Sequence, residues 1–261
     1  MTLLDHQLYV KRAELLHERI TSYKDYPFHI PAVRYLEQLS FTRPVTFIVG
    51  ENGSGKSTLL EAIAIAWGFN AEGGTLNYSF ETQASHSNLH EYIRLARGVK
   101  RPKDGFFFRA ESYYNVASYV DRLDEEPAGG RRVIESYGGK SLHAQSHGES
   151  FFSTFLNRFG GKGLYVMDEP EAALSPVRQL SMLKRMHELV QRDSQFIIAT
   201  HSPILMAYPN AEIWQFYSDR APELVEWEDT EHYIVTRKMM TERERMLQYL
   251  FDDEYEPSDS M

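Results

Sequence analysis

The stretch that decides the fold is Gly50–Ala64, "GENGSGKSTLLEAIA". It fits the spacing Gly50-x4-Gly55-Lys56-Ser57 in full, which is the pattern of a loop that binds nucleotide phosphates. Its glycines let backbone N–H groups turn toward phosphate oxygens, and the helix that follows adds the positive end of its dipole. We therefore expect nucleotide binding by Asn52, Gly53, Ser54, Gly55, Lys56, Ser57 and Thr58.

The context of the loop supports this interpretation. The apolar, β-branched run "VTFIV", 45–49, predicts a buried strand before it, and 57–67 predicts a helix that Gly68 ends. Lys56 would reach the β- and γ-phosphates, and the Ser57 hydroxyl would ligate Mg²⁺. A phosphate loop alone leaves GTPases, kinases, helicases and ABC-type ATPases open.

An acidic pair narrows these classes to hydrolases. In "GLYVMDEPEAALS", 163–175, Asp168 and Glu169 directly follow an apolar strand. The aspartate can hold the Mg²⁺ shell, and the glutamate can orient or deprotonate the attacking water. A GTPase would need an Asn-Lys-x-Asp element, which the sequence lacks, and a kinase needs no such glutamate because its acceptor replaces water.

Two further motifs extend the expected site. "QSHGES", 145–150, precedes a predicted helix, so Ser146, Gly148 and Glu149 would face an anionic phosphate from its positive end. "IIATHSP", 197–203, ends a predicted strand at His201, which would hydrogen-bond the γ-phosphate or the attacking water. In isolation such a histidine usually bonds to backbone, and its place after the other motifs favours a role in catalysis.

The remaining elements predict an α/β fold. Strands alternate with helices such as 176–192, for which Ser175 is the expected cap and Val177, Leu180, Leu183, Met186 and Val190 the expected buried face. This alternation implies a mostly parallel central sheet with helices on both faces. We also expect a strand in 8–16, a helix from 30 to 39, a hairpin of 224–229 with 232–237, and a capping box at Thr241 and Glu244.

The chain is expected to form one domain, 1–251, followed by a mobile acidic tail, 252–261. Segment 70–139 is rich in Gly, Ser, Asn and aromatic residues, which predicts an inserted helical subdomain.

The net charge and composition of the chain bear on whether it binds nucleic acid or a membrane. The charge balance, 28 − 37 = −9, argues against a large nucleic-acid footprint, while the basic run 97–103 leaves local contact with nucleic acid open. The chain has no cysteine, no signal peptide and no apolar run that could span a membrane, so we expect a cytoplasmic protein.

In the order of its motifs the chain resembles the ABC-type ATPase superfamily. The segments "VTFIVGENGSGKSTLLEAIA", "GFFFRAESYYNVASYVD" and "LYVMDEPEAALSPVRQ" are similar to stand-alone bacterial predicted AAA-type ATPases of the SMC/RecF-like group. The resemblance implies a P-loop NTPase head with a mostly parallel sheet, antiparallel β elements and a small inserted helical subdomain. The insertion is too short for a coiled coil, and the 60 residues after His201 (261 − 201) are too few for a nuclease domain.

The resemblance also implies function. It implies Mg²⁺-dependent ATP hydrolysis to ADP and phosphate by a homodimer that closes around ATP, with Ser146 and Gly148 contacting the partner's nucleotide. A further metal ligand is expected after the strand that feeds the helical subdomain. Glu111 is favoured there over Gln83, with Arg109 close enough to contact phosphate. The adenine-stacking residue stays open among Tyr23, Tyr26, Phe28 and Arg34.

The biological role is predicted from the form of the Ser-x-Gly-Glu motif. His147 stands where the family usually has the first of two glycines, and this form is more similar to chromosome-maintenance and repair ATPases than to transporter subunits. We therefore expect a soluble switch or motor in DNA repair, chromosome maintenance or defence, working with an unidentified protein partner. The alternatives are the ATP-hydrolysing subunit of a membrane transporter and a nucleotide-dependent interaction module with negligible turnover.

Overall fold

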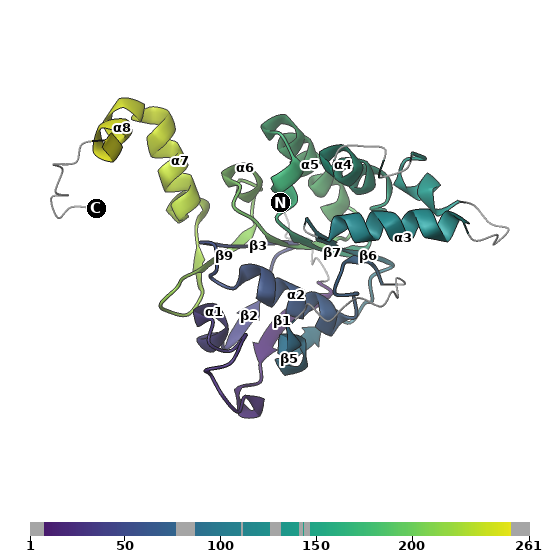
Figure 1. Ribbon diagram of the computed structural model, residues 1–261, viewed down its shortest axis with the longest axis horizontal. Helices are drawn as coiled ribbons and strands as arrows, with labels where there is room; N and C mark the ends of the chain where they lie inside the picture. The colour runs from purple at the N-terminus through teal and green to yellow at the C-terminus, as the bar shows by residue number, and fades with distance from the viewer. Residues whose placement is uncertain are drawn as a thin grey trace.

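The computed structural model describes residues 8–76, 87–110, 112–125, 132–140, 143 and 147–251 (Figure 1). Three predicted site residues, Glu111, Gln83 and Ser146, lie outside these ranges, as does the acidic tail 252–261. Within them the strands form one seven-stranded sheet and one three-stranded sheet.

The large sheet is mostly parallel, which confirms the predicted α/β class. Its strand order is β10-β9-β3-β8-β7-β6-β4, with parallel pairing from β9 through β6 and antiparallel strands at both edges. Near-continuous apolar runs suit strands that are buried on both faces. The strands are β3 Val45–Gly50, β4 Gly74–Thr75, β6 Asp104–Arg109, β7 Gly163–Asp168, β8 Gln195–Ala199, β9 Glu212–Phe216 and β10 Glu223–Val225.

The small sheet is antiparallel and has the order β2-β1-β5, with β1 Val10–Leu15, β2 Gln38–Ser40 and β5 Ile93–Arg97. A buried side chain, Gln195, joins it to the large sheet. Gln195 Oε1 accepts hydrogen bonds from the backbone N–H groups of Tyr9 and Val10 at 2.8 and 2.9 Å, and its Nε2 donates to Val10 O at 2.8 Å. Both polar atoms of the buried Gln195 side chain are thus hydrogen-bonded to the backbone of residues 9 and 10. These bonds fix the start of β1 against β8.

Helices cover both faces of the large sheet (Figure 1). Helix α2, Lys56–Trp67, lies between the two sheets, whereas α3 Tyr113–Glu125, α4 His147–Asn157, α5 Pro176–Val190 and α6 Pro203–Met206 cover the opposite face. Successive strand residues serve alternate faces: Phe47 packs into the cluster under α3–α6, and Ile48 into the cluster around α2. Two cores therefore share one sheet.

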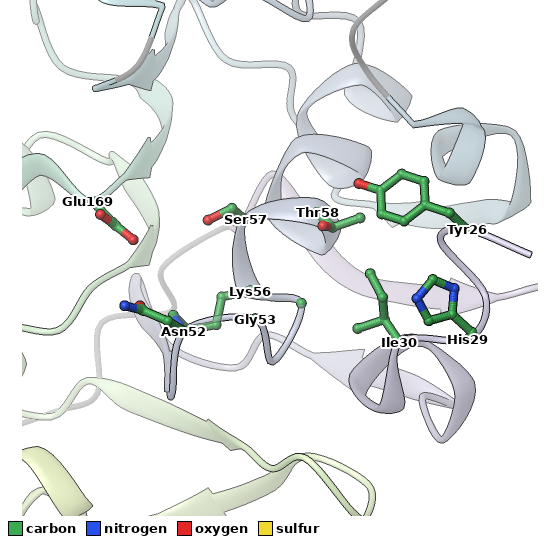
Figure 2. A pocket seen from close by; sticks show the side chains of 10 residues that line it. Tyr26, His29, Ile30, Asn52, Gly53, Lys56, Ser57, Thr58 and Glu169 are labelled. Carbon is green, nitrogen blue, oxygen red and sulfur yellow. The ribbon is translucent and has the colours of Figure 1, made fainter.

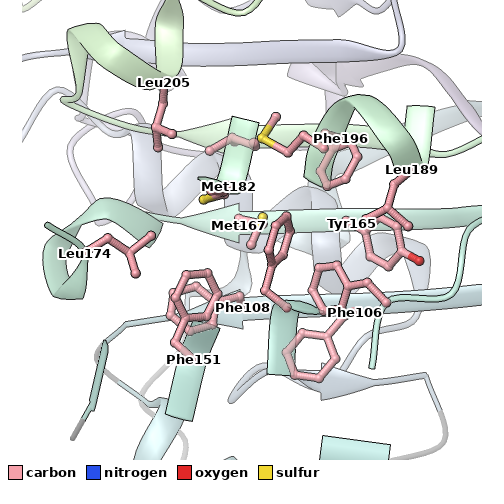
Figure 3. Packing of buried hydrophobic residues seen from close by; sticks show 14 of the residues in the cluster. Phe106, Phe108, Phe151, Tyr165, Met167, Leu174, Met182, Leu189, Phe196 and Leu205 are labelled. Atoms are coloured by element: carbon pink, nitrogen blue, oxygen red, sulfur yellow. The ribbon is translucent and has the colours of Figure 1, made fainter. Parts of the chain in front are cut away.

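Aromatic side chains dominate the core under α4 and α5 (Figure 3). Phe159 stacks on Tyr165 with ring centroids 4.2 Å apart and planes 6° apart, and Phe108 contacts Phe151 at 4.1 Å. Such pairs add to the free energy gained by burying the rings. They join α4 to β6 and β7, the strand that ends at Asp168.

The buried face of α5 agrees with the predicted one at Met186 and Val190 and differs from it in the first turns of the helix. Ser175 caps the helix as expected, accepting from Arg178 N. Val177 and Leu180, however, are 72% and 58% exposed, and the buried apolar residues are Met182, Met186, Leu189 and Val190. The i, i+4, i+7, i+8 spacing of this second set places it on one face, and the first turn of α5 extends beyond the core.

Segment 70–139 contributes strands to both sheets, β4 and β6 to the large one and β5 to the small one, as well as α3 and the 3₁₀ turn Val133–Tyr137. The boundaries of the inserted subdomain stay a prediction. Helix α1, Pro31–Arg34, has Pro31 at its first position but is shorter than predicted, because 38–40 pairs as β2.

The predicted C-terminal hairpin is wrong. Residues 223–225 pair with β9 as β10, and Glu231–Thr241 forms a helix, α7, that Thr230 caps by accepting from Tyr233 N. The capping box at Thr241 is also wrong, because α8 spans Arg243–Phe251 and the Thr241 hydroxyl donates to Arg237 O. Neither α7 nor α8 contains a buried residue, and both project away from the sheets (Figure 1).

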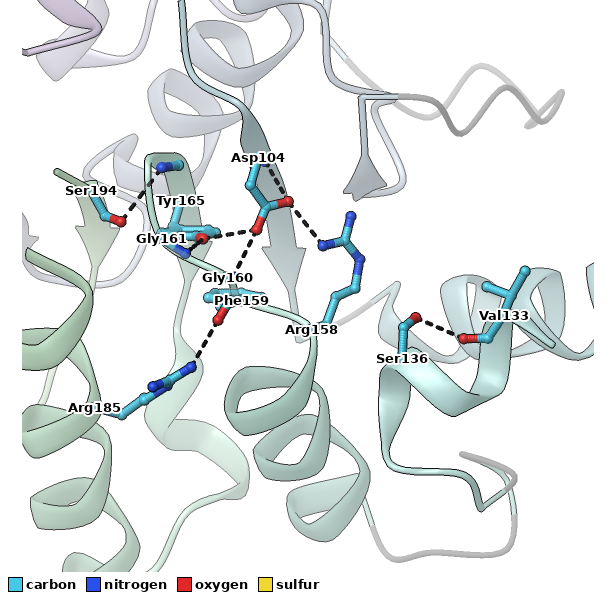
Figure 4. Close-up of polar contacts among 12 residues, drawn as sticks. Asp104, Val133, Ser136, Arg158, Phe159, Gly160, Gly161, Tyr165, Arg185 and Ser194 are labelled. Carbon is cyan, nitrogen blue, oxygen red and sulfur yellow. Dashed lines mark hydrogen bonds and ion pairs between the residues drawn. The ribbon is translucent and has the colours of Figure 1, made fainter. Parts of the chain in front are cut away.

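Asp104, the first residue of β6, is the centre of a group of polar contacts (Figure 4). The group lies at the end of the large sheet where β6 and β7 begin, opposite to the end that carries the phosphate loop. Asp104 Oδ1 accepts from Arg158 Nη1 at 2.9 Å, and Oδ2 accepts from the Tyr165 hydroxyl at 2.9 Å and from Gly160 N at 3.1 Å. Burial and the Asp104 charge raise the pKa of Tyr165, so its hydroxyl remains a donor. One carboxylate thus holds together β6, β7 and the end of α4.

Replacing Asp104 tests this group of contacts. Asp104→Ala leaves the Tyr165 hydroxyl and the Arg158 guanidinium without their acceptor, so we expect the free energy of unfolding to fall by about 3 kcal/mol. Urea denaturation followed by circular dichroism measures the loss. The exposed pair of Asp219 with Arg220, 3.7 Å apart, supplies the control, because Asp219→Ala should cost little. Equal losses in the two variants would contradict the role of Asp104.

Candidate active site

The candidate site lies where three parallel strands end. β3 leads into the phosphate loop, β7 into Asp168 and Glu169, and β8 into His201. β8 pairs with both neighbours at its last residue, since Ala199 is opposite Ile48 on one side and Asp168 on the other. The carboxyl ends of parallel strands are the usual ligand-binding edge of an α/β sheet.

The phosphate loop has the backbone that its glycines predict. Gly53 and Gly55 have φ values of 81° and 100°, in the left-handed region that other residues avoid. A Cβ atom at Gly55 would also lie 2.7 Å from Ile30 Cγ2, so the loop fits closely against α1. Helix α2 begins immediately afterwards at Lys56, and its unpaired N–H groups face the loop.

Lys56 is buried beneath this loop. Its Nζ donates to Gly50 O and Glu51 O, both at 2.8 Å. Burial lowers the pKa of Lys56, and the nearby carboxylates oppose that shift; the largest opposing effects come from Glu169 and Asp168. The ammonium group therefore lies among acceptors, and a phosphate oxygen could replace the loop carbonyls.

Two of the three predicted Mg²⁺ ligands, Ser57 and Asp168, meet directly. Ser57 Oγ donates to Asp168 Oδ1 at 2.9 Å, although 111 residues separate them in sequence. Within the described residues, no cluster of three or more His, Cys, Asp or Glu side chains could hold a metal ion by itself. A cation here would therefore need oxygens from the nucleotide as well as from Ser57 and Asp168.

Glu169 adopts an unusual backbone conformation beside the loop. Its φ and ψ are 48° and 52°, a left-handed geometry that costs a non-glycine residue about 1–2 kcal/mol. Its N–H donates to Ala199 O at 2.9 Å, and its side chain remains 41% exposed. Such strained residues cluster at functional sites, where the surrounding structure holds them in place.

His201 lies next to Glu169, as the motifs predict. Its Nε2 is 3.6 Å from Glu169 Oε1. Burial, and then the Lys56 and His232 charges, lower the pKa of His201 to about 4. The imidazole is therefore neutral at pH 7, and its contact with Glu169 is not an ion pair.

Two residues that hold His201 were not predicted from the sequence. Glu171 Oε1 accepts a hydrogen bond from the His201 backbone N–H at 2.6 Å, and burial raises the pKa of this carboxyl. His232 Nε2 lies 2.9 Å from His201 Nδ1. Glu171 stands two residues after Glu169 and could have been suspected from "DEPE"; His232 lies in α7, in a segment predicted to be a strand, and gave no signal.

A pocket of about 370 Å³ joins these features (Figure 2). The phosphate loop runs through its middle, with Glu169 on one side and Tyr26 and His29 on the other. Among the four base-stacking candidates, Tyr26 lines the pocket, while Tyr23 hydrogen-bonds His17 and Phe28 packs against Tyr92. The lining residues are Tyr26, His29, Ile30, Asn52, Gly53, Gly55, Lys56, Ser57, Thr58 and Glu169.

Gly148 and Glu149 do not line this pocket. They lie at the start of α4, where a Cβ on Gly148 would be 2.1 Å from Ala173 O, and where Glu149 Oε1 is 3.7 Å from Arg178 Nη2. Arg109 is also held elsewhere: its Nη1 lies 2.6 Å from Glu61 Oε2 on α2 and donates to Ala71 O. The structure thus pairs Arg109 with α2, and its contact with phosphate stays a prediction.

Comparisons with known proteins bear on the fold that carries these residues. A protein-family model described as an AAA domain matches residues 28–138. A nucleotide-free ATP-binding cassette from an ABC transporter has a TM-score of 0.50 and 16% identity, over 88% of this chain and 94% of that chain. The chain has the fold of an ABC-type ATPase. This confirms the fold that the motif order predicts.

The chain is also similar to a plant ABC transporter protein and to an SMC head domain. The ABC transporter G family member STR2 of Medicago truncatula is 27% identical over 173 residues, 61% of this chain and 24% of that protein. The chain thus spans about a quarter of that curated relative. An SMC head domain from Thermotoga maritima has a TM-score of 0.42 and 18% identity, over 84% of this chain and 100% of that chain. In the described ranges, no helix is long and apolar enough to cross a bilayer.

The backbone strain at Glu169 can be measured. We expect Glu169→Gly to be more stable than Glu169→Ala by about 1 kcal/mol, because glycine adopts the left-handed conformation freely and loses only part of that gain to chain entropy. Both variants lack the carboxylate, so the comparison isolates the backbone. Chemical denaturation of the two proteins gives the difference. A more stable alanine variant would show that the conformation at 169 is not left-handed.

The neutral state of His201 predicts a pH dependence of stability. Its pKa falls from about 6.5 to about 4 on folding, so protonation favours the unfolded chain. The stability this residue contributes is complete above about pH 6.5 and is lost as the pH falls toward 4. Between pH 7 and pH 5, His201→Gln should therefore lose about 2 kcal/mol less stability than the unsubstituted protein. Urea titrations at both pH values test this, and equal losses would contradict it.

Proposed function

We propose that this chain binds Mg-ATP and hydrolyses it to ADP and phosphate as one half of a homodimer that closes around the nucleotide. The observation that supports it best is the 2.9 Å contact between Ser57 Oγ and Asp168 Oδ1, beside the pocket that Ser57, Lys56 and Glu169 line. These side chains supply cation ligands, a phosphate-binding ammonium and a water-activating carboxylate at one strand edge.

The charges around Lys56 support a requirement for Mg²⁺. Four carboxylates, those of Glu169, Asp168, Glu171 and Glu51, act on this one ammonium group. ATP brings further negative charge, so a divalent cation is needed to balance the site. Oxygens of Ser57 and Asp168 would hold it, and when bound it would neutralise charge developing on the phosphates.

Each remaining residue has a role that follows from its place. Lys56 would exchange the carbonyls of Gly50 and Glu51 for phosphate oxygens. Glu169 would accept a proton from the attacking water, and neutral His201, 3.6 Å away, would donate a hydrogen bond from Nε2 to the γ-phosphate or to that water. Tyr26 and His29 would contact the base from the opposite wall of the pocket.

The start of α4 supports a composite site. Gly148 and Glu149 lie outside the pocket of their own chain, so the phosphate contacts that the motif predicts are left for a second copy. Ser146 would act beside them. Closing two copies around ATP would then add these contacts to both nucleotides, so ATP would stabilise the closed state only.

The process that this dimer serves is a finer proposal. The Ser-x-Gly-Glu form supports a switch or motor in DNA repair, chromosome maintenance or defence. The names of the relatives favour the alternative, the ATP-hydrolysing subunit of a membrane transporter. Affinity purification of the Glu169→Gln protein with Mg-ATP separates the two, since it would retain nucleic acid or a repair protein in one case and a membrane subunit in the other.

The Glu169→Gln variant tests hydrolysis and dimerisation together. The amide keeps the shape of the side chain but cannot take the proton from water, so we expect turnover to fall on the order of 100-fold or more. The variant should accumulate as an ATP-bound dimer, which size-exclusion chromatography with light scattering detects.

Lys56→Ala is the matched control, because it removes phosphate binding and not water activation. It should weaken ATP binding by about 100-fold and stay monomeric in the same column. A Glu169→Gln protein that is monomeric in saturating Mg-ATP would rule out the composite site, and unchanged ATP affinity in Lys56→Ala would rule out the phosphate loop.

A further inference from the structure

A second histidine contacts His201, the histidine that lies beside Glu169. His232 Nε2 is 2.9 Å from His201 Nδ1, and the two ring centroids are 5.0 Å apart. Both rings are partly buried, and His201 Nε2 is a buried atom without a hydrogen-bond partner beside Glu169. The contact therefore leaves one nitrogen of His201 for the reaction and engages the other.

The chemistry of the neighbours decides the direction of this hydrogen bond. Carboxyl oxygens carry lone pairs that accept hydrogen bonds, so the ring nitrogen 3.6 Å from Glu169 Oε1 interacts favourably with it when that nitrogen carries the proton. A neutral imidazole carries one N–H, which leaves His201 Nδ1 as an acceptor. His232 must then donate from Nε2. Burial lowers the pKa of both histidines, in keeping with two neutral rings.

The segment 227–232, which we call the root of α7, holds His232 in position. Thr230, which is fully buried, caps the helix and donates its hydroxyl to Trp227 O at 2.7 Å. Trp227 Nε1 in turn donates to Pro203 O at 3.1 Å, in the helix that begins two residues after His201. His232 is thus attached to the same turn that carries its partner. The rest of α7 contains no buried residue, so this root is where α7 meets the site.

We infer that His232 is a positioning residue for hydrolysis: by donating to His201 Nδ1 it fixes the tautomer in which His201 Nε2–H points at the γ-phosphate and the attacking water. The inference rests on the proposed function. The equivalent effect is known in general for catalytic histidines, whose orienting partner sets which ring nitrogen carries the proton. It also makes the first turn of the projecting helix α7 part of the active-site machinery.

Steady-state hydrolysis by three variants tests this role. His232→Leu removes the donor and should lower kcat on the order of tenfold or more, while KM for ATP changes by less than about twofold because Lys56 and the loop are untouched. His232→Gln places an amide N–H near the Nε2 position and should restore most of the rate. The control is His187→Leu, which removes an imidazole that contacts Tyr208 away from the pocket and should leave kcat unchanged.

A double variant excludes a merely structural effect. On a His201→Gln background, His232→Leu should cause no further loss of kcat, because its effect passes through His201. A further loss of the same size as in the single variant would overturn the inference, as would an unchanged kcat in His232→Leu. Thermal unfolding and the affinity for a fluorescent ATP analogue check that each variant is folded.

Nitrogen NMR of the resting protein tests the tautomer without any hydrolysis. With ¹⁵N-labelled histidine, His201 should show a protonated Nε2 and an unprotonated Nδ1 at pH 7.5, with its signals assigned through the His201→Gln variant. His232→Leu should shift His201 toward a mixture of tautomers, and His232→Gln should restore the original pattern. A proton on Nδ1 in the unsubstituted protein would overturn the inference. An inactive protein with the expected NMR pattern would instead contradict only the proposed function.

Discussion

The whole site depends on the register of β8 between its two parallel neighbours. Because Ala199 is opposite both Ile48 and Asp168, the ends of three strands reach the same level of the sheet. The phosphate loop, the acidic pair and His201 then meet without any long-range adjustment. A shift of one residue would turn β8 over and exchange the core residues of its two faces, so burial of Phe196 and Ile197 on opposite sides protects the register.

Beyond the strand ends, hydrogen bonds hold the residues in conformations that they would not adopt alone. The left-handed backbone of Glu169 is held by its N–H bond to Ala199 O. The His201 backbone is held in turn by Glu171, whose carboxylate accepts its N–H. The β7 and β8 ends therefore exchange hydrogen bonds in both directions. Strain at Glu169 is tolerated because the sheet and this exchange leave the turn few alternatives.

Local patterns explain what the sequence could predict. The strand at 45–49, the loop and the cap at Ser175 depend on near neighbours, and the structure contains them. The error at 232–237 has the same origin: "HYIVTR" alternates and is β-branched, as a strand would be, yet Thr230 caps a helix there. The sequence could not show that β9 already had a partner in β10, nor that His232 returns to His201 across 31 residues.

The electrostatics of the pocket explain why a neutral histidine suits this place. Lys56 already supplies a buried positive charge, and its repulsion contributes to the low pKa of both His201 and His232. Two protonated imidazoles could only donate, and they would repel each other across the 2.9 Å contact. When both rings are neutral, His232 on α7 can donate one hydrogen bond to His201 Nδ1. His201 can then donate a second hydrogen bond from Nε2 toward the phosphates. The hydrogen bonds orient His201 without adding charge to the site. Charge balance is then left to Lys56 and to the cation that we propose accompanies ATP.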